Sequence, residues 1–170
     1  MRVFLTLLAL LCCMAVNAIA AEENHMSDEA ASMHAHITEN GYYLHTAVST
    51  DFATTVENVR AALKEEGFGV LTEIDFSATM KAKLDKDTPP CLILGACNPP
   101  FAWQVFESEP WIGVEMPCNV VVRQLEDGSV EVAMKNPAML VEATGNDELG
   151  DVGAELTARV VRVLENVSHQ

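Results

Sequence analysis

The fold is decided by Cys91-Leu92-Ile93-Leu94-Gly95-Ala96-Cys97, a run of seven residues without a charge or a strongly polar side chain. Pro89-Pro90 precedes the run and Asn98-Pro99 follows it, and such breaks bound an element of strand length. A continuous apolar run of this kind is typical of a central strand that is covered on both faces. The run therefore predicts a buried strand at the middle of a sheet.

Segments with a strand period and segments with a helix period alternate on both sides of this run. We expect strands over 42–48, 68–76, 118–123 and 130–134, and helices over 52–66, 77–84, 99–109 and 149–167. Asp127-Gly128 predicts a tight hairpin and hence antiparallel pairing of the two strands beside it. Strands that alternate with helices around a hairpin predict an α+β single domain, with an antiparallel or mixed sheet and helices packed on it.

The amino terminus has the three parts of a secretory signal peptide over residues 1–20. Arg2 is followed by an apolar run and then by Ala18-Ile19-Ala20, which carries small residues at the expected cleavage site. The apolar run is too short to cross a bilayer as a helix. We therefore expect an exported protein, periplasmic or extracellular, with a flexible leader over 21–40, the domain over 41–170, and no membrane contact after cleavage.

The charge of the chain after cleavage argues against polyanionic partners. Without the signal peptide the chain keeps nine Lys and Arg residues against 25 Asp and Glu residues, a net charge of −16. Such a surface repels phosphate backbones and anionic headgroups. We therefore expect no nucleic-acid binding.

Four segments in a fixed order carry a resemblance to a known family. They are Gly67-Phe68, Leu71-Thr72-Glu73-Ile74-Asp75, Ile93-Leu94-Gly95-Ala96-Cys97-Asn98-Pro99 and Met116-Pro117-Cys118-Asn119-Val120-Val121-Val122. In that order and spacing, over about residues 42–140, the chain resembles the bacterial and archaeal family catalogued as domain of unknown function 302. The resemblance implies a small domain of β-α-β(4)-α type with a curved antiparallel sheet, in the TATA-binding-protein-like fold group, and it allows a homodimer. It brings no activity, cofactor or catalytic residue.

Three cysteines remain after the predicted cleavage, and they cannot all pair. Cys91 and Cys97 lie at opposite ends of one predicted strand, about 20 Å apart, whereas a disulfide requires Cα atoms within ~7 Å. We therefore expect a bridge between Cys97 and Cys118, with Cys91 as a buried free thiol. The functional alternative is a reactive thiol at Cys97, near the start of a helix, with Cys118 as its resolving partner.

The two Cys-Asn segments form the candidate site, which comprises Cys97, Asn98, Pro99, Cys118 and Asn119. Special residues are dense there, and no recognisable catalytic set accompanies them. The favoured hypothesis is an exported, noncatalytic domain that binds a small ligand, a metal or a protein partner at this surface. The alternative hypothesis is a periplasmic thiol/disulfide redox enzyme that uses Cys97 and Cys118.

Two further groups of residues have both a functional and a structural interpretation. Met33, His34 and His36 offer the thioether and imidazole ligands that copper or another metal takes outside the cytosol, although a polar linker has the same composition. No cofactor is otherwise indicated. Trp103 and Trp111 flank the helix between the two Cys-Asn segments, and we expect them to pack in the core, with a ligand pocket as the alternative.

Overall fold

The computed structural model describes residues 38–39 and 41–170, which include one α+β domain built on a six-stranded sheet. The strand order is β1-β2-β6-β5-β4-β3, and every pair of neighbours is antiparallel. The predicted fold class is therefore confirmed, with an antiparallel rather than a mixed sheet. The predicted signal peptide and the metal-ligand candidates Met33, His34 and His36 lie outside the described residues.

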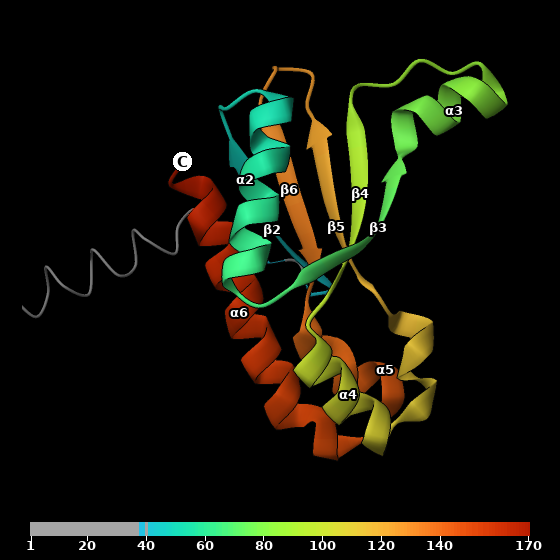
Figure 1. Ribbon diagram of the computed structural model, residues 1–170, viewed down its shortest axis with the longest axis vertical. Coiled ribbons are helices and arrows are strands. Elements are labelled where there is room, and N and C mark those ends of the chain that lie inside the picture. The colour runs from blue at the N-terminus through green and yellow to red at the C-terminus, as the bar shows by residue number, and fades with distance from the viewer. Residues whose placement is uncertain (1–37, 40) are drawn as a thin grey trace, which may run out of the picture. The chain divides into compact units, whose positions relative to one another are not determined.

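The elements follow one another much as the sequence periods predict (Figure 1). The strands are β1 (Thr38–Glu39), β2 (Tyr43–Val48), β3 (Gly69–Asp75), β4 (Cys91–Cys97), β5 (Cys118–Gln124) and β6 (Val130–Lys135). The helices are α2 (Phe52–Glu65), α3 (Phe76–Leu84), α4 (Pro99–Ser108), α5 (Leu140–Thr144) and α6 (Gly150–Ser168), with short 3-10 turns η1 (Pro110–Glu115), η2 (Pro137–Met139) and η3 (Asp147–Leu149). No helix among the described residues is long and apolar enough to span a bilayer.

Helix α2 begins and ends at the residues that its sequence signals indicate. The Asp51 carboxylate accepts a hydrogen bond from the backbone N–H of Thr54 at 3.1 Å, which satisfies one of the free donors of the first turn. Gly67 follows the helix with a φ of +80°, a conformation that residues with a Cβ rarely adopt. The chain can therefore turn directly from α2 into β3.

Helices α2 and α6 cover one face of the sheet and form the core with it (Figure 1). The predicted apolar stripe of the last helix is buried, and it comprises Leu149, Val152, Leu156, Val160, Val163, Leu164 and Val167. These side chains pack with Val59 and Leu63 of α2 and with Val120 and Val132 of the sheet. Burial of this apolar surface supplies most of the driving force for folding.

Only one face of β4 is covered, so the prediction of two-sided burial was wrong. Leu92, Leu94 and Ala96 point to the helices and are buried, whereas Cys91 and Ile93 on the other face are only half-buried. Antiparallel strands are joined by short connections and need no crossover helix on the second face. An apolar run can therefore belong to a strand with one open face.

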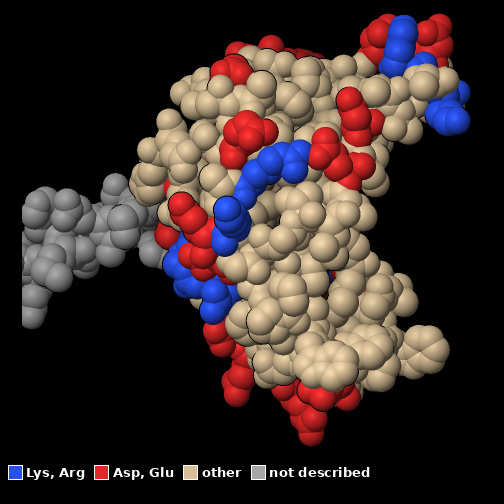
Figure 2. Space-filling view, viewed as in Figure 1, with Lys and Arg blue, Asp and Glu red and all other residues tan. Residues whose placement is uncertain are grey.

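Strand β3 and helix α3 form an arm at the edge of the sheet, where little packs against them. None of the side chains of α3 is buried, and almost all of β3 is exposed. In Figure 1 the helix projects away from the sheet. The charged residues at its carboxyl end include Lys81, which contacts Asp85 and Asp87 (Figure 2).

Candidate functional site

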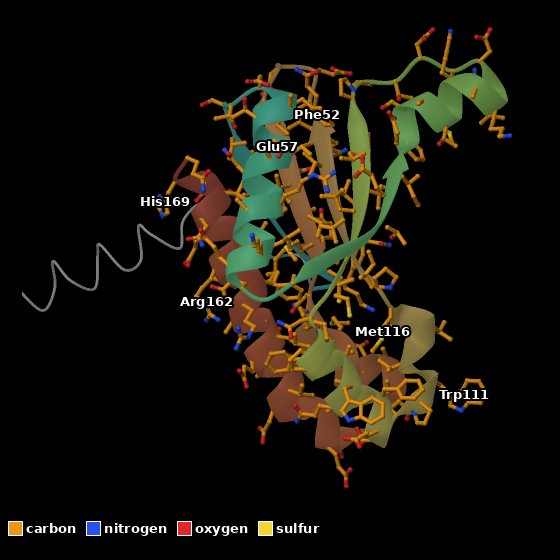
Figure 3. The ribbon with its side chains drawn as sticks, in the orientation of Figure 1. Phe52, Glu57, Trp111, Met116, Arg162 and His169 are labelled. Atoms are coloured by element: carbon orange, nitrogen blue, oxygen red, sulfur yellow. The ribbon has the colours of Figure 1, made fainter. Side chains whose placement is uncertain are left out.

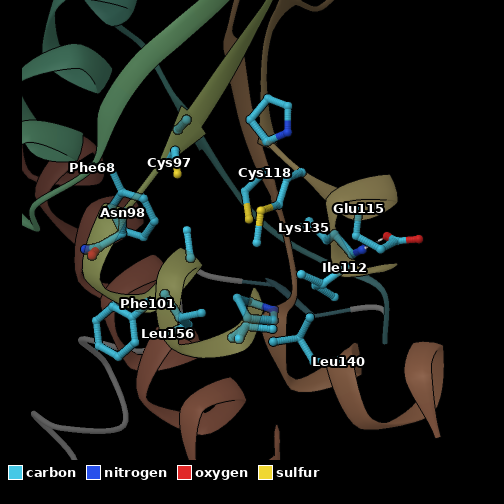
Figure 4. A pocket seen from close by; sticks show the side chains of 16 residues that line it. Phe68, Cys97, Asn98, Phe101, Ile112, Glu115, Cys118, Lys135, Leu140 and Leu156 are labelled. Carbon is cyan, nitrogen blue, oxygen red and sulfur yellow. Dashed lines mark hydrogen bonds and ion pairs between the residues drawn. The ribbon is translucent and has the colours of Figure 1, made fainter. Parts of the chain in front are cut away.

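A cavity lies at the end of the sheet, where β4 and β5 meet α4, η1, α5 and α6 (Figure 4). Its volume is about 60 Å³, and about 560 Å³ when the gaps between the wall atoms and the open space at its mouth are included. The walls are almost entirely apolar and include Phe68, Phe101, Ile112, Leu140 and Leu156. Three of the predicted site residues, Cys97, Asn98 and Cys118, lie in this wall, so the structure brings the two cysteine segments together.

The predicted Cys97–Cys118 disulfide is absent, since both thiols are free. In the register of β4 and β5, the residue opposite Cys118 is Ala96, not Cys97. Successive side chains of a strand alternate between the two faces. Cys118 therefore leaves the sheet on the same side as Ala96, and the alternation directs Cys97 to the other side, although both border the cavity.

Burial raises the pKa of each cysteine thiol, which opposes the formation of a reactive thiolate. The Cys118 pKa is raised first by burial and is then influenced by the Lys135 ammonium group, which lowers it. The Cys97 pKa is raised by burial alone. Free Cys91 lies away from the cavity and shows the same direction of shift. At neutral pH the cavity thus presents neutral thiols.

Asn98 borders the cavity, and its side chain also ties two distant backbone segments together. Its side chain is 7% exposed, and its Nδ2 donates a hydrogen bond to the backbone oxygen of Glu66 at 3.1 Å. Asn98 occupies the predicted N-cap position of α4, but its side chain makes no capping hydrogen bond there. Pro99 begins α4 as predicted and is exposed outside the cavity. These two residues join the end of α2 to the start of α4.

Asn119 lies apart from the other predicted site residues. It is exposed and pairs with Gly95 across the two strands. It borders a wide, open groove on the uncovered face of the sheet, not the cavity between the sheet and the helices. The second Cys-Asn pair is therefore divided between the two sides of β5.

Gly95 allows two distant segments to approach β4 on its open face. A Cβ atom at this position would lie 2.6 Å from Cγ of Pro117 and would also collide with the Thr72 side chain. Only a residue without a side chain leaves this space free. The glycine in the apolar run thus fixes how the segment before Cys118 crosses the sheet.

Sequence reasoning missed the ion pair between Lys135 and Glu115, which borders one side of the cavity (Figure 4). Lys135 ends β6 and Glu115 ends η1, so 20 positions separate them and no short motif links them. Met116, which is half-buried, borders the same space. A Lys at the end of a strand is ordinary in sequence and gives no signal of its own.

The expectation that Trp103 and Trp111 pack in the core was wrong. Their exposed fractions are 62% and 81%, and Figure 3 shows Trp111 on the outside of η1. The residues that do pack inward from α4 and η1 are Val105 and Ile112. Both short elements bury only one narrow stripe, which leaves their large aromatic side chains on the outer face.

No group of three or more His, Cys, Asp or Glu side chains suited to a metal ion occurs within residues 41–170. Methionine is not among these four residue types, and Met33, His34 and His36 lie outside the described residues. A site for copper or another metal in the leader, with a polar linker as the alternative, therefore stays untested.

Fold and cavity together define a small α+β domain with an antiparallel sheet, one helical layer and an apolar space at the end of the sheet. The family model for the domain of unknown function DUF302 matches residues 44–167, and the chain belongs to this family. The crystal structure of an uncharacterized conserved DUF302 protein from Bacillus stearothermophilus is similar, with a TM-score of 0.70 and 30% sequence identity. The match covers 75% of this chain and 99% of that one. No curated protein matches the chain.

Proposed function

We propose that this domain is a noncatalytic binding module that holds a small apolar molecule in the cavity beneath β4 and β5. The observation that carries the proposal is the composition of the cavity wall, which is apolar apart from neutral thiols, Asn98 and one ion pair. Concave apolar sites with a few polar groups are the usual form of small-molecule sites. The export of the protein and its periplasmic or extracellular location remain part of the proposal.

The packing around the cavity supports a ligand over a simple packing defect. Phe68, Val105 and Ile112 are themselves buried, so the wall is held by side chains that are anchored in the core. The cavity also opens to solvent between short elements, which gives a ligand a route to it. An apolar ligand would remove water from this wall and gain free energy in proportion to the area covered.

The alternative of a thiol/disulfide redox enzyme has less support. Such chemistry needs a thiolate at Cys97 or Cys118, and burial raises the pKa of both thiols. It also needs a bond between the two sulfurs, and both thiols are free although they border the same cavity. We therefore assign no catalytic role to either cysteine.

The test uses 1-hexanol as a neutral probe and two-dimensional NMR spectra of the full chain. We expect saturable shifts of the backbone amide signals of Ala96, Cys97 and Val105. Ala102 borders the cavity from α4, so Ala102→Leu should reduce the affinity at least tenfold by occupying the space. Ala61 is exposed on α2, and Ala61→Leu is the matched control that should bind 1-hexanol normally. Equal binding by both variants, or shifts spread over the whole surface, would refute the proposal.

A further inference from the structure

Among the described residues that line the cavity, only Lys135 and Glu115 carry a charge, and they form an ion pair. Both residues border the cavity and also the groove on the open face of the sheet, so they lie at the boundary between the two spaces. The Lys135 side chain is 25% exposed and that of Glu115 is 42% exposed. The ammonium group is therefore the more deeply placed of the two charges.

The influence of the two charges on Cys118 also indicates that Lys135 lies nearer to the inside of the cavity than Glu115 does. Lys135 has a larger influence on the Cys118 pKa than Glu115 has, and it acts in the direction that favours a negative charge. Cys118 belongs to the inner wall of the cavity. A negative group that entered the cavity near Cys118 would thus meet the field of the ammonium group first.

Lys135 also has hydrogen-bonding capacity to spare. An ammonium group carries three N–H donors, and among the described residues Lys135 makes one side-chain hydrogen bond, to Oε2 of Glu115. A carboxylate of a ligand can therefore bind to the remaining donors without displacement of Glu115. Charge-assisted hydrogen bonds are stronger than neutral ones.

We infer that the ligand is a short amphiphilic carboxylate, with its apolar chain in the cavity and its carboxylate on Lys135. This inference rests on the proposed function and adds the class of ligand to it. The apolar wall around Phe101 and Leu156 accepts the chain, while the ammonium group fixes the direction in which the chain enters. The opposite polarity, with an amine bound to Glu115, is the competing outcome of the test.

The experiment compares three probes of equal chain length, namely hexanoate, 1-hexanol and hexylamine, by NMR titration of the full chain at neutral pH. We expect hexanoate to bind about tenfold more tightly than 1-hexanol, the gain of one charge-assisted hydrogen bond after its desolvation cost. We expect hexylamine to bind no better than 1-hexanol.

Two variants locate the origin of the preference. Lys135→Met keeps the length and apolar stem of the side chain, and it should remove the preference for hexanoate while 1-hexanol still binds. Glu115→Gln removes the carboxylate that competes for Lys135, and it should leave hexanoate binding unchanged or tighter. Thermal unfolding of both variants checks that they fold.

The outcomes separate the two proposals. If 1-hexanol binds but hexanoate binds no more tightly, or hexylamine binds best, the carboxylate inference is wrong and the binding module stands. The same conclusion follows if the preference for hexanoate persists in the Lys135→Met variant. Failure of all three probes to bind in the cavity overturns the binding module itself, and the carboxylate inference with it.

Discussion

The layer between the sheet and helices α2 and α6 differs sharply from the arm of β3 and α3, although both contain many apolar residues. Leu63 of α2 is fully buried, whereas Leu84 of α3 has an exposed fraction of 61%. The apolar residues of α2 recur on one face of the helix, whereas those of α3 stand at every second position and are spread around it. The difference teaches that a helix is buried where its apolar residues form one face and the sheet offers a surface to cover it.

The cavity lies where the covered layer ends. Helix α4 buries only Val105 fully, and η1 buries only Ile112. These elements are held to the core by fewer side chains than α2 or α6, and a space remains between them and the sheet. Binding capacity in this domain is therefore found at the border of the packed layer, not at its centre and not on the arm.

The largest expected effect is the loss of a side chain from the packed layer. Leu63→Ala should lower the free energy of unfolding by about 3 kcal/mol, since it leaves a cavity among residues that cannot collapse into it. Urea denaturation followed by circular dichroism measures the change. A loss below about 1 kcal/mol would mean that this layer is not the stable part of the domain.

The next largest effect distinguishes the two Cys-Asn pairs. Asn98→Ala should lower the free energy of unfolding by about 1 kcal/mol, because the backbone oxygen of Glu66 loses the hydrogen bond that Asn98 donates. Asn119→Ala is the matched control, since Asn119 is exposed on the open face and no hydrogen bond of its side chain to another described residue is found. The same denaturation experiment compares them, and equal losses would contradict the structural role of Asn98.

Much of the fold follows from local sequence signals. The last helix buries the predicted stripe, Asp51 caps α2, and the hairpin at Asp127-Gly128 joins two antiparallel strands. These features depend on residues that are close in sequence, or on a period that one element sets for itself. The one-sided burial of β4 was not predictable in this way, since it depends on where the helices of other segments lie.

The candidate site was predicted only in part, for the same reason. Cys97 and Cys118 contribute to one cavity because β4 and β5 are neighbours, and the expected bridge between the two residues already placed them close together. The register that places Ala96 opposite Cys118 is a tertiary property, and it removed the expected disulfide. Lys135 and Glu115 meet across 20 positions and carry no local signal.

A smaller effect is expected on the free energy of unfolding at alkaline pH. It measures how well Cys118 in the cavity wall is buried. Burial raises the Cys118 pKa in the folded state above the ordinary thiol value of about 8.5. The folded protein then holds this proton more tightly than the unfolded chain does, so stability is complete below the unfolded pKa and decreases as the pH rises. Cys118→Ala should therefore flatten the decrease in unfolding free energy between about pH 8 and 10.

Cys91→Ala is the control for this measurement, because Cys91 lies outside the cavity and shares only the direction of the shift. We expect it to change the slope less than Cys118→Ala does. Urea denaturation at several pH values gives the slopes. A wild-type slope that survives Cys118→Ala unchanged would show that this thiol is solvated in the folded protein.

The smallest expected effect lies in the arm, where the comparison with the packed layer is most direct. Leu84→Ala removes the same atoms as Leu63→Ala, but from an exposed position, and it should change the free energy of unfolding by no more than about 0.5 kcal/mol. Because α3 has no buried side chain, the substitution leaves no cavity in the core of a single chain. A loss comparable to that of Leu63→Ala at high protein concentration, which disappears on dilution, would instead show that the arm is covered in an assembly. In that case the contrast between the two regions would hold only for the separate chain.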